Sequence, residues 1–119
     1  MIALSNSNFK AQLAAERKRV IFVVFRSTFC EHCHALLDLL SRLEAEYSSD
    51  FLFANVNCSD TLNEHLADEY GVASYPSGVL FFRGKVIADF EGELSEGQLR
   101  DEVFGPVADI LHEKIKGKG

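Results

Sequence analysis

Two long apolar runs without polar alternation dominate the first half of the chain. Residues 20–25 read Val-Ile-Phe-Val-Val-Phe, and residues 51–57 are again largely apolar. Such runs are typical of strands that are buried on both faces of a sheet. We therefore predict central strands at 20–26 and 51–57, with residues 2–4 as a short edge strand.

Helical patterns surround these strands. Apolar residues spaced three and four apart follow the first run and predict a helix that ends at about Tyr47. A shorter helix is expected earlier, from an N-cap at Ser7 to the basic residues 17–19. A capping box at Thr61–Glu64 predicts a third helix, which Gly71 ends. The apolar stripes of the second and third helices are Leu36, Leu39, Leu40, Leu43 and Tyr47, and Leu62, Leu66, Ala67 and Tyr70.

The order strand–helix–strand–helix predicts parallel strands that are joined by right-handed crossovers. The pattern then changes, because strands at 78–83 and 86–91 flank a tight Gly84-Lys85 turn and predict an antiparallel hairpin. The two halves together predict an α/β fold with a mixed central sheet flanked by α-helices.

The C-terminal part of the chain is again helical in pattern. Ser95-Glu96-Gly97-Gln98 fits a capping box, and Gly105-Pro106 is expected to break or sharply kink the helix that it opens. An amphipathic stripe at 107–115 is expected to pack on the core, with pairing against a second subunit as the alternative. Residues 116–119 are expected to fray.

Composition narrows the possible functions. With 119 residues, of which 47% are hydrophobic and 25% charged, the chain fits a single globular domain over residues 1–119. The net charge of −6 argues against nucleic-acid binding, and no apolar run approaches the roughly 20 residues of a membrane span. Residues 1–6 lack the basic and apolar regions of a signal peptide. We therefore expect a cytoplasmic protein, with a secretory compartment as the alternative if a leader has been removed.

The motif Cys30-Glu31-His32-Cys33 lies where the first buried strand ends and a helix begins. Free N–H groups and the positive dipole end at a helix start stabilise a thiolate, so the pKa of Cys30 should fall below that of a free thiol. Cys33 lies one turn later, close enough to close a disulfide. The spacing predicts a reversible redox pair in which Cys30 is the exposed nucleophile. The alternatives are an inert pair or half of a zinc site, for which Cys58 and histidines would have to converge.

Further features follow this motif in a fixed order. Tyr70-Gly71-Val72-Ala73-Ser74-Tyr75-Pro76 is similar to a Y-G-V-x-x-(I/Y)-P segment, Phe81-Phe82-Arg83-Gly84-Lys85 to an F-x-x-G-K hairpin, and Gly92 to a late glycine. With the cysteine motif, they resemble the thioredoxin superfamily nearly end to end. The His before the second cysteine, the Tyr-Pro pair and Asn57-Cys58 at a strand end resemble the domains of protein disulfide isomerase.

The resemblance implies a thioredoxin fold and thiol–disulfide exchange on protein substrates, without a bound cofactor or metal. Cys30 would attack a substrate disulfide, and Cys33 would resolve the mixed disulfide. A reductase or another redox partner protein would supply or accept the electrons, and the protein would be a monomer or a weak dimer. A cis-proline and an apolar groove would hold an extended peptide. The groove residues would be Phe29, Tyr75, Pro76 and Gly92.

Four further positions are expected to modulate the pair. A protonated His32 would stabilise the Cys30 thiolate and raise the reduction potential, from roughly −270 mV toward roughly −180 mV. Glu31 lies beside it and is also expected to be a modulating residue. His34 could also tune the site, and the favoured alternative is that it lies on the exposed face of the helix. Val24 stands where the family usually carries a buried Asp or Glu. That carboxylate accepts a proton during resolution, so the resolving step is expected to be slow here.

Other departures from the family pattern leave alternatives open. Asn55 aligns near the family's lysine, Phe29 with its tryptophan and Asp38 with its helix-kinking proline.

One alternative function is a non-catalytic adaptor module that holds a partner in the groove. Another is a dithiol oxidase or isomerase of an oxidising compartment. Cys58 is expected to be a buried apolar residue, with an intermolecular disulfide as the alternative.

Overall fold

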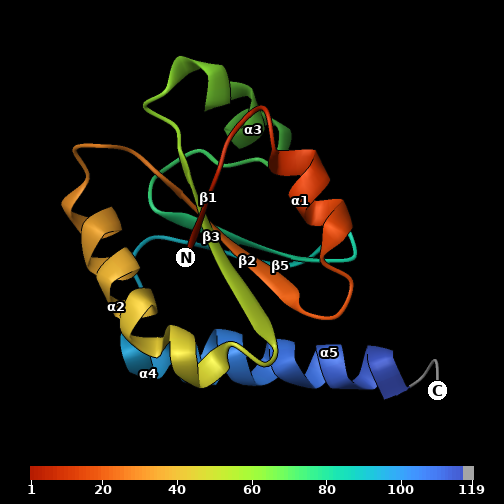
Figure 1. Cartoon of the computed structure of the whole chain (residues 1–119). Coiled ribbons are helices and arrows are strands. Elements are labelled where there is room, and N and C mark those ends of the chain that lie inside the picture. The colour runs from red at the N-terminus through yellow and green to blue at the C-terminus, as the bar shows by residue number, and fades with distance from the viewer. Residues whose placement is uncertain (117–119) are drawn as a thin grey trace.

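A five-stranded mixed sheet runs through the middle of the molecule (Figure 1). The structure, a computed structural model, describes residues 1–116. The strand order is β1-β3-β2-β4-β5, in which β1, β3 and β2 are parallel and β4 and β5 are antiparallel to their neighbours. The predicted mixed sheet and parallel first half are confirmed. The strands are β1 (Ile2–Leu4), β2 (Val20–Arg26), β3 (Phe51–Asn57), β4 (Ser77–Phe82) and β5 (Lys85–Glu91).

Helices cover both faces of this sheet, which explains why β2 is apolar and buried from Val20 to Phe25. On one face, α1 and α3 pack on alternate residues of β2, among them Ile21 and Phe25. On the other face, α2 and the C-terminal helices pack on Val20 and Phe22. The helical segments are α1 (Phe9–Ala15), α2 (Glu31–Tyr47), the 3-10 helix η1 (Thr61–Asn63), α3 (Glu64–Glu69), α4 (Glu96–Gln98), the π-helix η2 (Leu99–Phe104) and α5 (Gly105–Lys116).

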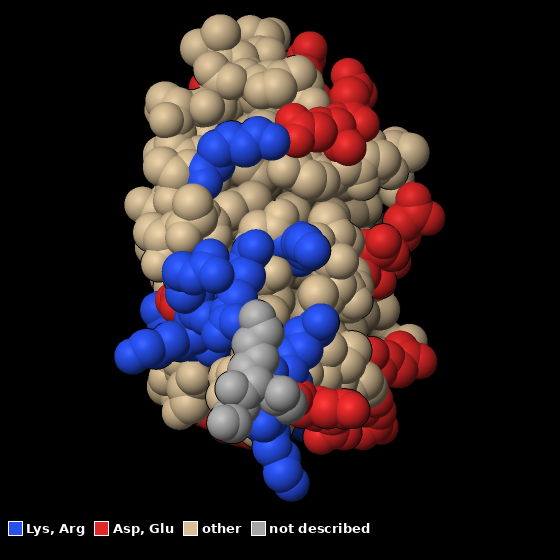
Figure 2. Space-filling view, turned by 90° about the vertical axis from the view of Figure 1, so that its right-hand side faces the viewer, with Lys and Arg blue, Asp and Glu red and all other residues tan. Residues whose placement is uncertain are grey.

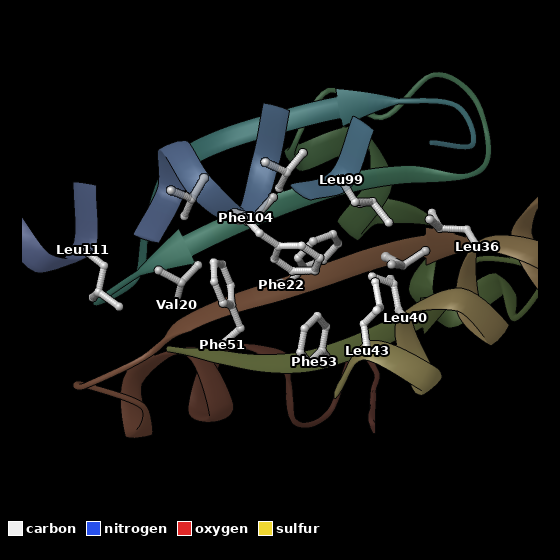
Figure 3. Close-up of a cluster of buried hydrophobic side chains, with 14 of the residues drawn as sticks. Val20, Phe22, Leu36, Leu40, Leu43, Phe51, Phe53, Leu99, Phe104 and Leu111 are labelled. Carbon is white, nitrogen blue, oxygen red and sulfur yellow. The ribbon is translucent and has the colours of Figure 1, made fainter. Parts of the chain in front are cut away.

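Aromatic rings fill the core beneath α2 and α5 (Figure 3). Phe104 is fully buried, and its ring stacks on Tyr47 with centroids 3.9 Å apart. Phe22, Phe51 and Phe53 meet the same ring at centroid distances of 5.8, 5.2 and 5.9 Å. Tilted and edge-to-face pairs at such distances add to the stability that burial provides. This cluster holds the C-terminal end of α2, at Tyr47, against the sheet.

The first helix is shorter than predicted. The N-cap of α1 is Asn8 rather than Ser7, and α1 ends before the basic residues. The reason is local: the Glu16 carboxylate accepts hydrogen bonds from the backbone N–H groups of Lys18 and Arg19, at 3.1 and 3.2 Å. These bonds turn residues 16–19 into a loop that leads into β2.

The predicted capping box at Thr61–Glu64 is also wrong. The Asp60 side chain accepts a hydrogen bond from the N–H of Leu62 at 3.0 Å, so the chain opens with the 3-10 helix η1 before α3 begins. Leu62 is consequently 68% exposed and does not join the apolar stripe. Gly71 does end the helix as predicted, with a φ of +70° that favours glycine.

The predicted capping box at Ser95 is confirmed, because Ser95 and Gln98 bond each other's backbone N–H groups. The predicted break at Gly105-Pro106 is wrong. The Gly105 N–H donates to the carbonyl of Arg100, five residues back, and the helix widens into the π turn of η2. A wider turn leaves space for a ring that lacks an N–H and would clash with the fourth carbonyl back in an α-helix. The chain therefore continues directly into α5.

The amphipathic stripe of α5 divides between core and surface. Val107 and Leu111 are buried in the core, as predicted, whereas Ile110 and Ile115 are 37% and 45% exposed. The predicted frayed end beyond Lys116 lies outside the described residues. Across residues 1–116, no helix has the length and apolar character needed to cross a membrane.

The hairpin of β4 and β5 forms as predicted, with its turn one residue earlier. Arg83 and Gly84 occupy the two turn positions with φ values of +52° and +81°. Two consecutive positive φ values define the type I′ turn that matches the twist of paired strands.

Candidate active site

The cysteine motif lies at the strand–helix junction that the sequence predicts. Cys30 is the N-cap of α2 and has extended backbone angles, with φ −125° and ψ 102°. Its sulfur accepts a hydrogen bond from the backbone N–H of Cys33 at 3.2 Å. One of the free donors at the helix start is thus aimed at the Cys30 sulfur, where it favours negative charge.

The structure places Cys30 and Cys33 in a disulfide, with Cα atoms 5.2 Å apart. Their accessibility differs sharply: Cys33 is fully buried, whereas Cys30 is half-buried. A polypeptide substrate therefore reaches the sulfur of Cys30 and not that of Cys33.

A hollow of about 430 Å³ opens beside the disulfide. The peptide bond between Tyr75 and Pro76 is cis, and the Pro76 carbonyl accepts a hydrogen bond from the N–H of Gly92 at 2.8 Å. Phe29 does not line this hollow and stands 98% exposed next to Cys30. The predicted groove is therefore assembled only in part. The lining residues are His32, Tyr75, Pro76, Gly92, Glu93 and Ser95.

Glu93 is a site residue that the sequence analysis did not single out. Its carboxylate lies 2.7 Å from Nδ1 of His32, and both residues line the hollow. The contact joins the first turn of α2 to the loop after β5 and fixes the orientation of the imidazole. By contrast, Glu31 and His34 are exposed, and neither side chain makes a hydrogen bond or ion pair with another described residue. In the sequence, Glu93 was marked only by its position directly after Gly92.

A family comparison agrees with this geometry. A sequence model of thioredoxin matches residues 1–104. The chain belongs to the thioredoxin family. It is 28% identical over 101 residues to the thioredoxin of Buchnera aphidicola subsp. Acyrthosiphon pisum (strain APS), covering 85% of this chain and 91% of that protein. It is 22% identical over 118 residues to protein disulfide-isomerase 2-3 of Arabidopsis thaliana, covering 99% of this chain but 26% of that longer protein.

Solved thioredoxin structures have the same fold. The Fasciola hepatica thioredoxin superposes with a TM-score of 0.75 at 26% identity, covering 87% of this chain and 96% of that one. Thioredoxin f2 of Chlamydomonas reinhardtii superposes with a TM-score of 0.76 at 21% identity, over 84% and 91% of the two chains. The fold is thus the thioredoxin fold. With its cysteine pair, this family member is a thiol–disulfide oxidoreductase, and the family implies protein disulfides as substrates and a reductase as partner.

Within the thioredoxin fold, the site lacks a buried acid. Val24 is fully buried in the cluster that also contains Leu36, three residues after Cys33 on α2. Among residues 1–116, the buried polar side chains are Asn63 and Ser77, and no carboxylate is buried. No buried carboxylate among the described residues can therefore accept the proton of the resolving cysteine.

Asn55, opposite Val24 on β3, takes part in a different contact. Its side-chain oxygen accepts a hydrogen bond from Nε of Arg26 at 2.9 Å, and its side-chain nitrogen donates to the carbonyl of Ile2 at 3.4 Å. This amide ties β3 to the strands on either side of it. It carries no charge that would assist a proton transfer at the cysteines.

Cys58 lies beneath the proline loop and is 6% exposed, as its predicted role as a buried apolar residue requires. Burial raises the pKa of the Cys58 thiol. Burial, followed by the nearby Cys58 thiol, raises the pKa of Tyr75 to about 12. This proximity of the end of the third strand to the substrate hollow was not visible in the sequence. Across residues 1–116, no three His, Cys, Asp or Glu side chains gather into a metal site.

Proposed function

We propose that the protein exchanges disulfides in polypeptide substrates, with Cys30 as the attacking thiolate and Cys33 as the resolving thiol. The observation that carries this proposal is the unequal burial of the pair, since Cys33 is fully buried and Cys30 is not. The Cys33 N–H that points at the Cys30 sulfur supports the same assignment. We include in the proposal that residues 1–119 act as one thioredoxin-like domain in the cytoplasm.

The exchange is balanced in two steps. The Cys30 thiolate attacks one sulfur of a substrate disulfide, a mixed disulfide forms, and the first substrate thiolate leaves. The Cys33 thiol then loses its proton and attacks the Cys30 sulfur, which releases the second substrate thiolate. The substrate gains two electrons, and the protein ends with the Cys30–Cys33 disulfide. A partner reductase reverses that change by the same chemistry.

The hollow beside Cys30 supports binding of an extended peptide. Tyr75, whose side chain is 38% exposed, lines the hollow together with Pro76 and Gly92. We assign Phe29 a separate contact with substrate, because its ring is fully presented to solvent beside Cys30. The paired side chains of His32 and Glu93 add polar groups to the lining of the hollow.

Trapping of mixed disulfides tests the division of roles. In Cys33→Ser, attack by Cys30 still occurs but resolution cannot, so disulfide-linked complexes with insulin should accumulate on a non-reducing gel. Cys30→Ser should trap far fewer complexes. Cys58→Ser serves as the control and should behave as the wild type, because Cys58 is buried. Equal trapping by Cys30→Ser and Cys33→Ser would contradict the assignment.

A further inference from the structure

A group of basic side chains lies on the surface around the β4–β5 turn and the end of α5 (Figure 2). Arg17 comes from the loop before β2, and Arg83 from the turn between β4 and β5. Lys85 is the first residue of β5, and Lys114 lies in α5. Together with Phe82, these four side chains line a hollow of about 310 Å³. We refer to Arg17, Arg83, Lys85 and Lys114 as the basic patch.

The patch is held in shape by contacts of Arg83. Its Nε donates a hydrogen bond to the backbone carbonyl of Arg17 at 3.0 Å, and its guanidinium lies 4.8 Å from the ring centroid of Phe82. Arg83 also has a φ of +52°, at a turn position that normally takes Asn, Asp or Gly. A non-glycine residue in this conformation costs free energy. Arg83 thus occupies a turn position at which Asn, Asp or Gly would adopt the same backbone conformation at a lower cost in free energy.

The charges of the patch are available for a partner. Within residues 1–116, none of its four side chains forms an ion pair, whereas Lys10, Arg19 and Arg100 are each paired with a carboxylate. Four like charges around one hollow repel one another, and an anion placed between them removes that repulsion. The patch therefore favours an anionic ligand in a protein whose net charge is −6.

The surroundings limit the extent of that anion. Figure 2 shows carboxylates along one side of the basic face, so the positive region is bounded. A duplex nucleic acid or an anionic bilayer continues past the patch and would place phosphates against these carboxylates. A short acidic segment of a protein fits within the basic patch. The carboxylates of such a segment pair well with guanidinium and ammonium groups. We infer that the basic patch is a docking site for an acidic polypeptide segment of a partner protein.

This docking site is separate from the exchange site. Strand β2 begins beside the patch and reaches the cysteine loop after seven residues, which span roughly 20 Å at about 3.3 Å per residue. A partner on the patch therefore leaves Cys30 accessible. The oxidoreductase can be held on an acidic protein while it exchanges disulfides, a role beyond the reaction itself.

Fluorescence anisotropy with a labelled decaglutamate peptide at low salt tests the inference on the full chain. The patch variant Lys85→Gln/Lys114→Gln is compared with Lys10→Gln/Arg42→Gln, which removes the same charge from exposed positions outside the patch. Each exposed charge changes affinity by up to about fivefold. We expect binding about tenfold weaker in the patch variant and within about twofold of wild type in the control.

Several outcomes would overturn the inference. They are an absence of decaglutamate binding, an equal loss in both variants, or tighter binding of an oligonucleotide or of phosphatidylserine vesicles. Insulin reduction by the patch variant should proceed at the wild-type rate, and a parallel loss of that rate would contradict the separation of the two sites. Peptide binding is measured without a disulfide substrate, so its result is independent of the exchange roles of the cysteines.

Discussion

Val24→Asp places a carboxyl group in the buried cluster that contains Leu36, three residues after Cys33 on α2. Cys33 is fully buried, so water has poor access to accept its proton when it resolves the mixed disulfide. A positioned general base contributes about 10²- to 10⁴-fold to such a step. A single substitution does not position the new carboxylate as well as an evolved general base, so its gain in rate should be smaller. We expect resolution to be about tenfold faster in Val24→Asp.

The same substitution should destabilise the fold. Val24 is fully buried, and losing its burial removes about 1.5–3 kcal/mol. A buried carboxyl group without a hydrogen-bond partner costs about 1–3 kcal/mol more. The free energy of unfolding should thus fall by about 2.5–6 kcal/mol, which lowers the Tm by about 10–24 °C at about 4 °C per kcal/mol.

Val24→Asn is the matched control, because it has the same size and polarity without a titrating proton. Burial raises the pKa of an Asp at this position, so the native state binds more protons than the unfolded state above about pH 4. The stability of Val24→Asp relative to Val24→Asn should therefore decline as the pH rises from about 4 toward neutrality. Melts across this range measure that difference.

Stopped-flow mixing of each reduced variant with a chromogenic aromatic disulfide separates the two chemical steps. The first coloured thiolate reports attack by Cys30, and the second reports resolution by Cys33. We expect only the second phase to accelerate in Val24→Asp, and neither phase to accelerate in Val24→Asn. An equal second phase in the two folded variants would refute the idea that a missing base limits resolution.

Three further predictions use other parts of the structure. Gly78→Ala should lower stability by about 1–3 kcal/mol in a denaturant melt, because a Cβ there would lie 2.1 Å from the Phe90 ring. Phe29→Ala should change stability by less than about 0.5 kcal/mol, since the side chain is 98% exposed, yet raise the KM for insulin. Burial raises the pKa of Cys58, so its stabilising contribution is complete below the unfolded pKa of about 8.5 and is lost as the pH rises above it. Cys58→Ala should therefore flatten the fall in Tm between about pH 7.5 and 9.5.

The sequence predicted those features that depend on neighbouring residues or on regular spacing. The buried strands, α2, the hairpin and the strand–helix junction at Cys30 all have local signals, and all are present. Capping was less predictable because adjacent side chains compete for the same N–H groups. At η1, Asp60 rather than Thr61 provides the cap. At Pro106, a π turn removes the clash that was expected to break the helix.

The parts of the site that the sequence did not predict depend on contacts between distant segments. His32 and Glu93 are 61 residues apart, and no local pattern relates them. The influence of Cys58 on the pKa of Tyr75 likewise comes from residues of two separate segments, a loop and the end of β3. Phe29 was assigned to the groove by its place beside Cys30, but the structure leaves its ring in solvent. Side-chain direction at a loop position was the missing information in each case.

Reduction of insulin by the dithiol protein tests the central claim most directly. The reduced wild-type protein should precipitate insulin chains much faster than an equal concentration of dithiothreitol, and Cys30→Ser should lose this activity entirely. One protein disulfide should form for each insulin disulfide that is reduced, because two electrons pass between the pairs. A wild-type rate no faster than dithiothreitol alone, or an unchanged rate in Cys30→Ser, would contradict the account.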